Sequence, residues 1–310
     1  MTDTVRQLGL DTFPQYSDGK LVYQNADGSV SILDQPSPMS GALRIVGGAG
    51  RLVSSLSEQI EPERIRLAHA VKSVRLEGES VVASCLTGGQ PIEFRADQLA
   101  MAIPARLAGQ LDWSPGLPES AMRMLNATPT WMAGHAKFFA VFESPYWRGN
   151  GLCGTASSLH GPLTEIHDAS PKTGECGILF GFVGLDPSTR IAWGKERVIE
   201  ASLNQIKQLF GADEVAESVH YLDWSLESYT AAESDRVPQT RHPDYGQTVD
   251  VGTVWRNKIH FIASEFSAHG GGLIEGALFG GHEFAANVLR QDSVLRSDST
   301  HVASMGWDWL

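Results

Sequence analysis

The stretch 259–289 constrains the fold of this chain more than any other segment. It reads as a hydrophobic strand, a Ser-Glu pair, a loop that ends in Gly270, Gly271 and Gly272, and an amphipathic helix. Glycines ahead of a helix allow a ligand to approach the first backbone N–H groups, where the helix dipole favours negative charge. The segment therefore predicts an anion-binding turn between a strand and a helix, the alternative being a glycine loop that serves only a tight turn.

A flavin nucleotide would suit this turn. Its pyrophosphate, or the anionic N1–C2=O edge of its reduced ring, matches the charge preference of a helix start. Glu265, at the end of the strand, is placed to accept a hydrogen bond from a ribityl or ribose hydroxyl. A second glycine turn, VGGAG at 46–50, has Val53 where a GxGxxG fingerprint needs glycine, so we interpret it as a structural turn.

Composition narrows the class of protein. A chain of 310 residues with 42% hydrophobic and 19% charged residues suits two globular domains or one large α/β unit. The net charge of -12 argues against a nucleic-acid partner, because phosphate binding needs clustered Lys and Arg. The three cysteines form no CxxC pair, so we expect neither a disulfide framework nor a structural zinc site. No apolar run suggests a membrane span or a secretion signal, which predicts a soluble, cytoplasmic protein without membrane association.

Strand-like and helix-like patterns alternate along the chain. The sequence NADG at 25–28 predicts a hairpin loop, and 61–103 predicts a meander of antiparallel strands that ends in the apolar run QLAMAIP. Residues 195–210 predict an amphipathic helix that Gly211 terminates. Several prolines within 104–131 predict a crossing between domains. The alternation predicts an α/β or mixed α+β protein whose two halves the chain visits more than once.

One lysine interrupts an otherwise apolar strand. Lys137 lies within the run GHAKFFAVF, and a buried lysine is costly unless it is paired, while burial lowers its pKa. Such a lysine often has a functional reason, for example holding a water or activating a substrate. The alternative is a lysine at the edge of a sheet whose ammonium group reaches solvent.

Other polar and aromatic side chains carry weaker signals. His160, His167 and Asp168 match no compact metal-binding spacing, so we assign them to a polar loop and expect no metal site. Three aromatic side chains near loops, which pack against neighbours more often than they line pockets, are nevertheless candidates for a pocket wall. These are Trp224, Tyr229 and Tyr245.

Five segments, taken in order, resemble the flavin monoamine and polyamine oxidase family across nearly the whole chain. LRIVGGAGRLVSSLSEQI is similar to the start of the second flavin-domain passage, and QLAMAIP to the "VI-AIP" strand. HAVKSVRLEG is similar to the strand whose backbone meets the adenine, which implies this role for Val71. AKFFAVFESPYWR resembles the substrate-domain strand whose lysine holds a water near flavin N5, which implies that role for Lys137.

The fifth segment, HFIASEFSAHGGGLIEGALFGGHEFAANVL, is similar to the closing flavin motif of this family. The match implies that Glu265 binds the ribityl–phosphate region. It also implies that the backbone of Gly272, Leu273, Ile274 and Glu275 meets the flavin ring. The family chemistry is removal of a hydride from the carbon next to an amine nitrogen, with FAD as acceptor. Reoxidation by O2 then gives hydrogen peroxide, and the imine hydrolyses to an aldehyde.

The resemblance also implies a domain plan: an incomplete FAD-binding Rossmann-type domain and a mixed-sheet substrate domain. Its segments are 1–42 (substrate), 43–112 (FAD), 113–226 (substrate) and 227–310 (FAD). The N-terminal βαβ unit with GxGxxG, and a long helical insertion, are expected by the family pattern and have no counterpart in this sequence. The expected partner is a small-molecule amine or a related substrate, and the sequence does not predict the oligomeric state.

Single positions depart from the family pattern. Glu233 stands where some members attach the flavin through cysteine, which implies non-covalent FAD. Ser234 and Leu273 stand at the two tyrosines that often cage the amine, which leaves Trp224 as the remaining aromatic wall. Two alternatives therefore stay open: a non-catalytic or impaired remnant that cannot bind FAD alone, and a flavoenzyme of the desaturase or porphyrinogen-oxidase kind acting on a non-amine substrate.

Overall fold

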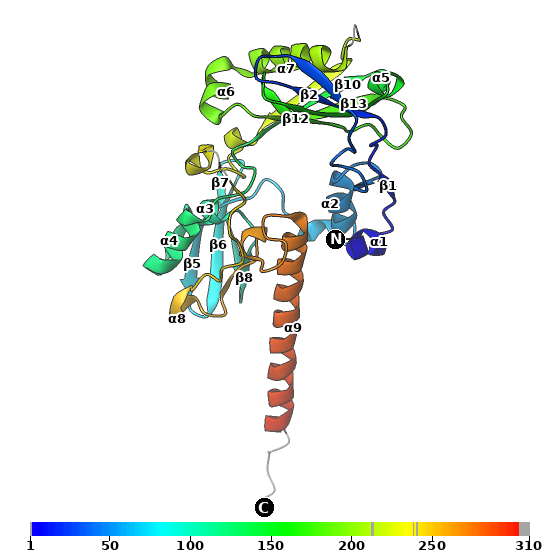
Figure 1. The fold of residues 1–310 in the computed structure, drawn as a ribbon. Helices are drawn as coiled ribbons and strands as arrows, with labels where there is room; N and C mark the ends of the chain where they lie inside the picture. Colours follow the sequence, from blue (N-terminus) through cyan, green and yellow to red (C-terminus); the bar gives the residue numbers. More distant parts are fainter. Residues whose placement is uncertain (1, 212–213, 238, 240, 304–310) are drawn as a thin grey trace, which may run out of the picture. The chain divides into compact units, whose positions relative to one another are not determined.

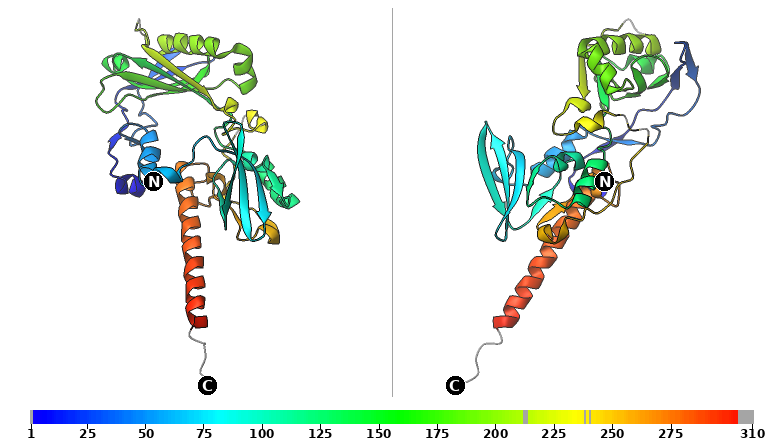
Figure 2. Two further views of the ribbon diagram at one scale, coloured as in Figure 1. Left: turned by 180° about the vertical axis from the view of Figure 1, so that it is seen from behind. Right: turned by 90° about the vertical axis from the view of Figure 1, so that its left-hand side faces the viewer.

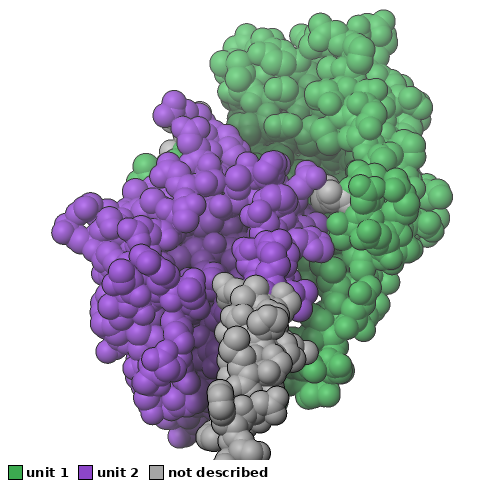
Figure 3. Space-filling model, turned by 90° about the horizontal axis from the view of Figure 1, so that it is seen from below, with its two compact units in different colours: residues 1–66, 132–240 green, residues 67–131, 241–310 purple. Residues whose placement is uncertain are grey.

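The computed structural model describes residues 2–211, 214–237, 239 and 241–303. The chain forms two compact units, coloured separately in Figure 3. Unit 1 comprises Met1–Arg66 and Met132–Thr240, and unit 2 comprises Leu67–Trp131 and Arg241–Leu310. The chain passes between units after residues 66, 131 and 240, whereas the sequence predicted passages after 42, 112 and 226. The assignment of these segments to flavin and substrate stays a prediction.

A seven-stranded mixed sheet forms the centre of unit 1. In sheet order, its strands are β14 (Ser218–Asp223), β10 (Ala136–Phe142), β13 (Gly177–Val183), β12 (Leu163–Asp168), β11 (Leu152–Ser158), β2 (Lys20–Gln24) and β3 (Val30–Leu33). Neighbouring strands are antiparallel except for the parallel pair β11 and β2. The predicted hairpin loop at 25–28 is confirmed, since it joins β2 to β3 and Gly28 has a positive φ of 85°.

Helix α7 (Lys195–Phe210) covers one face of this sheet (Figure 1). Its buried residues recur at helical spacing and include Val198, Ile206 and Leu209, which pack on the buried side chains of β10. The helix ends as predicted at Gly211, which adopts the left-handed conformation with φ 67°. Along β10, fully buried residues alternate with half-buried ones, so the second face of the sheet is less covered than the first.

The remaining elements of unit 1 are short. They are α1 (Thr2–Gln7), β1 (Thr12–Pro14), β4 (Leu43–Ile45), α2 (Gly50–Ser57), η1 (Pro62–Arg64), α5 (Tyr146–Gly149), α6 (Pro187–Trp193), η2 (Trp224–Leu226) and η3 (Glu233–Arg236). The glycine turn before α2 is a tight turn in which Gly47 and Gly48 have φ of 82° and 85°. Helix α2 follows this turn directly and ends at Ser57.

Unit 2 contains a four-stranded sheet in the order β7 (Gln90–Ala96), β6 (Ser80–Thr87), β5 (Ala70–Glu77) and β9 (Asp112–Ser114). The predicted antiparallel meander is confirmed by the β5–β6 and β6–β7 pairs. The helices α3 (Ala105–Gly109) and α4 (Glu119–Ala127) lie beside this sheet (Figure 2). The buried core of the unit includes Val74 and Val81 of the sheet and Leu125 of α4. Since 104–131 forms these elements, it belongs to unit 2, and the chain leaves the unit only after Trp131.

A two-stranded parallel sheet in unit 2 joins β8 (Leu99–Met101) to β15 (Ile259–Phe261). The segment β15, η4 (Ser264–Phe266) and α9 (Ile274–Ala303) has the predicted order of strand, glycine loop and helix, and α8 (Gly252–Trp255) precedes it. In Figures 1 and 2, α9 is one continuous helix that extends away from the other elements of unit 2. The predicted mixed α/β class and two-unit organisation are therefore confirmed.

Candidate functional site

The loop before α9 needs glycine at two positions because a neighbouring side chain leaves no room for a Cβ atom there. A Cβ atom on Gly271 would lie 2.5 Å from Tyr245 Cβ, and one on Gly272 would lie 2.5 Å from Tyr245 Cε2. Gly272 also has φ of 73°, a conformation that side chains disfavour. The Tyr245 ring thus supports the loop from one side, and its hydroxyl donates to Pro129 O at 2.8 Å.

Helix α9 begins directly after this loop. Ala277 N–H donates to Leu273 O at 3.2 Å, so the hydrogen-bond ladder of α9 begins at Leu273, and the positive end of the helix dipole lies at this loop. Leu273 and Ile274 are 54% and 48% exposed, which is high for apolar side chains at a helix start. A flat apolar ring with an anionic edge could contact the exposed apolar side chains and place its negative charge at the N-terminal end of the helix, where the helix dipole is positive.

Glu265 is 5% exposed, and the residue before it, Ser264, accepts a hydrogen bond from Gly272 N–H of the loop at 3.3 Å. Its carboxylate accepts hydrogen bonds from Thr130 Oγ1 at 3.0 Å and Ser264 Oγ at 2.9 Å. A carboxylate offers about four acceptor positions, so two bonds leave acceptor capacity for a ligand hydroxyl. The observed bonds fix the side chain, as binding a ribityl or ribose hydroxyl requires. Thr130 carried no signal in the sequence, because its bond to Glu265 joins positions 135 residues apart.

Val71 lies near the start of β5, where the strand pairing is irregular. The register between β5 and β6 shifts between Val71 and Ser73, which marks a bulge. On its other side β5 pairs with β9 only from Ser73 to Arg75, so in the described part of the chain no strand flanks Val71 there. A bulge with a free strand edge suits the backbone contact to an adenine that the resemblance implies for Val71.

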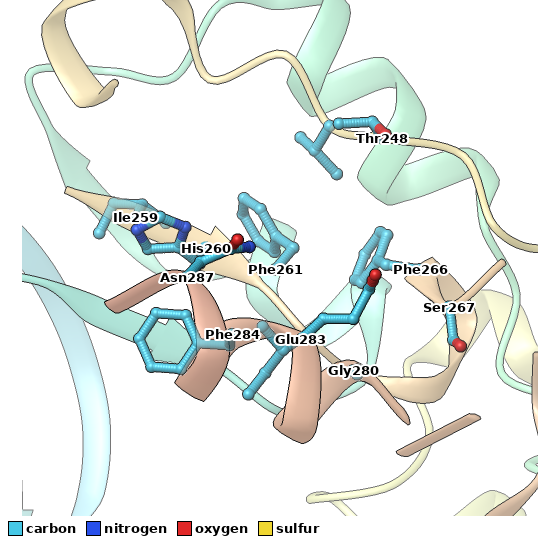
Figure 4. A pocket seen from close by; sticks show the side chains of 13 residues that line it. Thr248, Ile259, His260, Phe261, Phe266, Ser267, Gly280, Glu283, Phe284 and Asn287 are labelled. Carbon is cyan, nitrogen blue, oxygen red and sulfur yellow. The ribbon is translucent and has the colours of Figure 1, made fainter. Parts of the chain in front are cut away.

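A cavity of about 370 Å³ lies between β15 and α9. Figure 4 shows His260 and Phe261 on one side and Glu283, Phe284 and Asn287 of α9 on the other. Burial lowers the pKa of His260, which favours the neutral imidazole. Its Nε2 is buried and has no hydrogen-bond partner among the described residues, while its ring lies 5.0 Å from that of Phe284. The residues that line this cavity and the glycine loop before α9 belong to the same unit, unit 2.

Lys137, a predicted catalytic residue, belongs to unit 1, whereas the predicted cofactor-binding residues belong to unit 2. Its strand β10 lies between β13 and β14, so Lys137 is not on a sheet edge. The ammonium nitrogen lies 6.0 Å from the Phe180 ring and 5.7 Å from the Phe182 ring, and no described residue forms a hydrogen bond or ion pair with it. Burial lowers the pKa of Lys137, as the sequence predicted for a lysine in such a strand.

Trp224 follows β14 in unit 1 and is half-buried. Its backbone N–H donates to the carbonyl of His135 at 3.0 Å; His135 directly precedes β10 and is two positions before Lys137 in the chain. Just before it, Asp223 forms a buried ion pair with Arg190 through two contacts of 2.7 Å. Tyr229 is 75% exposed, and Tyr245 belongs to unit 2, so the suggested aromatic group does not assemble within either unit.

The assignment of His167 and Asp168 to a polar loop was wrong. Both lie on β12 and are buried. Asp168 accepts hydrogen bonds from Trp147 Nε1 at 2.9 Å and Arg148 Nε at 2.8 Å, a structural network for a carboxylate that is 1% exposed. Among the residues whose side chains are described, no group of three His, Cys, Asp or Glu is arranged to hold a metal ion.

Comparison with known proteins identifies the family. The chain matches the family described as flavin containing amine oxidoreductase over residues 8–289. The chain belongs to this family. It is 24% identical over 254 residues to amine oxidase [flavin-containing] B of Sus scrofa, an alignment that covers 79% of this chain and 47% of that protein. It is 24% identical over 272 residues to putrescine oxidase of Kocuria rosea, covering 81% of this chain and 54% of that protein.

Solved structures of flavin amine oxidases share the fold of the chain. Wild-type putrescine oxidase bound to putrescine has a TM-score of 0.72 at 18% identity and covers 93% of this chain and 85% of that one. Cyclohexylamine oxidase from Brevibacterium oxydans has a TM-score of 0.72 at 17% identity and covers 94% of this chain and 85% of that one. The chain spans about half the length of the curated relatives it matches.

Family membership implies a flavin, and the residues of unit 2 fit one. Six of the predicted site residues, Val71, Glu265, Gly272, Leu273, Ile274 and Glu275, belong to that unit, and Lys137 and Trp224 belong to unit 1. Within the described residues, no helix combines the length and the apolar character needed to cross a membrane.

Proposed function

We propose that the chain is an FAD-dependent oxidoreductase of the amine oxidase type. It oxidises a C–N bond of a small amine, with O2 as final electron acceptor, to an imine and hydrogen peroxide, and the imine hydrolyses to an aldehyde. FAD, when bound, supplies the electron chemistry. The observation that carries the proposal is the start of α9, where the exposed apolar side chains of Leu273 and Ile274 lie at the positive end of the helix dipole, in the same unit as the buried Glu265 that Thr130 and Ser264 fix.

Unit 2 supplies the residues proposed to hold FAD without a covalent bond. Glu265 accepts a hydrogen bond from a ribityl or ribose hydroxyl, because Thr130 and Ser264 already orient its carboxylate. The positive end of the α9 dipole would favour the negative charge of a bound flavin. Leu273 and Ile274, which are exposed, would contribute apolar contacts to it.

Unit 1 supplies the residues proposed to act on the amine. Among the described residues, none forms a hydrogen bond or ion pair with the Lys137 ammonium group, so a water is a suitable ligand for it in solution. That water serves the reoxidation of the flavin or the hydrolysis of the imine. Trp224, half-buried beside the same strand, forms an aromatic wall for the substrate.

The test begins with FAD binding to the whole purified chain. We expect a retained visible flavin band and quenched flavin fluorescence after gel filtration. Glu265→Gln is expected to weaken FAD binding about tenfold or more, since it removes a charge-assisted hydrogen bond from a buried position. Glu79→Gln, whose side chain is 99% exposed in the same unit, is the matched control and should bind FAD as the wild type does. Loss of all flavin on gel filtration would refute FAD binding by this chain and favour the non-catalytic alternative.

A second measurement tests the reaction. Hydrogen peroxide formation with a panel of amines, with an equimolar yield of aldehyde, is the expected result. A chain that retains FAD but reduces it only with C–C or other non-amine substrates would instead belong with desaturase-like flavoenzymes. The substrate panel therefore separates the two catalytic alternatives, which FAD binding alone does not.

A further inference from the structure

A groove follows one edge of β15 in unit 2. The cavity of about 370 Å³ between β15 and α9 is lined by an unbroken run of the chain, residues 259–263, which comprises β15 and the two residues after it. A cavity that meets only one face of a strand contacts alternate residues, because successive side chains point to opposite faces. Contact with every residue of the run therefore means that the cavity follows the backbone. Figure 4 shows the labelled side chains of β15 and α9 around this open space.

This edge of β15 has no strand beside it. β15 pairs in parallel with β8, and no described strand pairs with its other edge. Lys258 O accepts a hydrogen bond from Leu99 N–H of β8 at 2.8 Å. Backbone groups alternate in direction along a strand, so the N–H and C=O groups of Ile259 and Phe261 point away from β8. Such groups on an edge strand are a template for pairing with another chain.

Both faces of β15 are covered, although its edge is open. The side chains of Ile259 and Phe261 pack into the core of unit 2. His260, which alternates with them, has its ring 5.0 Å from that of Phe284 of α9. Strands of parallel sheets are usually covered on both faces and lie between further strands. β15 therefore has the coverage of an interior strand and the hydrogen bonding of an edge strand.

The groove contains a hydrogen-bond acceptor that lacks a donor. Burial lowers the pKa of His260, and a hydrogen bond to the Asn257 backbone opposes this shift. Nε2 has no partner among the described residues, so Nδ1 forms the bond to Asn257 and carries the hydrogen. In the neutral ring Nε2 is then an acceptor, and a side chain with a hydroxyl or ammonium group that enters the groove can donate to it.

Glu283 determines the charge of the groove. It is an exposed residue of α9 and, apart from His260, the only acidic or basic residue that lines the groove. No described residue forms an ion pair or hydrogen bond with it, so a basic side chain of a partner complements it. A second copy of this chain does not, because in a two-fold pair the same groove faces itself. Two Glu283 carboxylates would then approach each other in a chain of net charge -12.

We propose that the open edge of β15 is a docking site for an extended segment of a partner protein, which adds a third strand to the sheet of β8 and β15. The segment alternates apolar residues, on the face of Ile259 and Phe261, with polar residues that face α9, and one of these is a lysine or arginine opposite Glu283. Main-chain hydrogen bonds supply the affinity in this mode of recognition, and side-chain contacts supply the specificity. The inference does not depend on flavin binding or on amine oxidation.

The test uses two fluorescein-labelled peptides with capped ends, VKVTV and VEVTV, which differ only in the charge of the second residue. Fluorescence anisotropy with the whole chain at low salt is expected to show VKVTV binding tighter than VEVTV by about threefold to tenfold. Glu283→Lys should invert this preference, and the fold tolerates it because the side chain is exposed. Glu119→Gln on α4 removes a carboxylate that is 85% exposed in the same unit and should leave both affinities unchanged.

Hydrogen exchange then locates the bound peptide. Saturating VKVTV should slow exchange of the Ile259 and Phe261 amides by about tenfold or more, and that of the His260 amide, which faces β8, by less. No binding of either peptide at millimolar concentration, protection elsewhere in the chain, or a preference that Glu283→Lys does not invert would each overturn the inference. Protection of Ile259 and Phe261 that rises with the concentration of the chain alone would show that a second copy occupies the edge, and would refute the partner segment.

Discussion

Gly280 and Gly281 are neighbours in α9 whose replacement by alanine should have opposite effects. A Cβ on Gly280 would lie 2.5 Å from Ile262 O, a backbone atom that cannot rotate away. A Cβ on Gly281 would meet no atom within 4 Å. The two positions share helical backbone geometry, so they differ in surroundings and not in conformation. Gly281→Ala is therefore the matched control for Gly280→Ala.

The magnitudes follow from two terms. Alanine is favoured over glycine in a helix interior by about 1 kcal/mol, and both variants gain this term. Forcing a methyl group into a filled space costs about 1 to 3 kcal/mol, and only Gly280→Ala incurs this cost. We therefore expect Gly281→Ala to stabilise α9 by up to about 1 kcal/mol. Gly280→Ala should leave the helix about 1 to 3 kcal/mol less stable than Gly281→Ala.

Hydrogen exchange of the α9 amides under native conditions is the suitable assay, because it reports local opening in a chain with two units. A difference of 1 to 3 kcal/mol corresponds to protection factors that differ by about 5-fold to 150-fold. Equal protection in the two variants would refute the close contact between α9 and the end of β15. Greater protection in Gly280→Ala than in Gly281→Ala would show that a methyl group at position 280 stabilises the helix and causes no clash with Ile262 O.

Two further predictions concern unit 1. Burial alone would raise the pKa of Asp223, but hydrogen bonds from Arg190 and Ser225 outweigh burial and lower it. The ion pair therefore stabilises the fold above the unfolded pKa of aspartate, and this contribution is lost as pH falls through the lower folded pKa. Asp223→Asn should cost about 3 to 5 kcal/mol at neutral pH and progressively less in acid, which thermal unfolding across pH would measure; a pH-independent cost would contradict the assignment. Burial lowers the pKa of Lys137 in the folded chain. The buried ammonium group therefore destabilises the fold fully below this lowered pKa, and the destabilisation disappears as the pH rises through the pKa of lysine in the unfolded chain. Lys137→Met should therefore raise the melting temperature at neutral pH while reducing oxidase activity, and a variant with lower stability or full activity would contradict the role of this lysine.

The sequence predicted those elements that form because of residues close to one another in the chain. The helix 195–210 and its end at Gly211 followed from apolar spacing and from the conformational freedom of glycine. The apolar strand around Lys137 and the strand–glycine–helix order of the last segment were equally readable, because alternation and glycine runs act on neighbouring residues. The loop assignment of His167 failed because burial on a central strand depends on the strands beside it.

The sequence by itself determined the strand and helix at 259–289, the glycines between them and the apolar context of Lys137. Only the tertiary structure decided why those glycines are needed, since the ring that excludes a side chain comes from Tyr245, well outside the loop. It also decided that Thr130 fixes Glu265, and that the open edge of β15 lies along a groove beside α9. Strand register and packing join residues far apart in the chain, and no local periodicity encodes those distances.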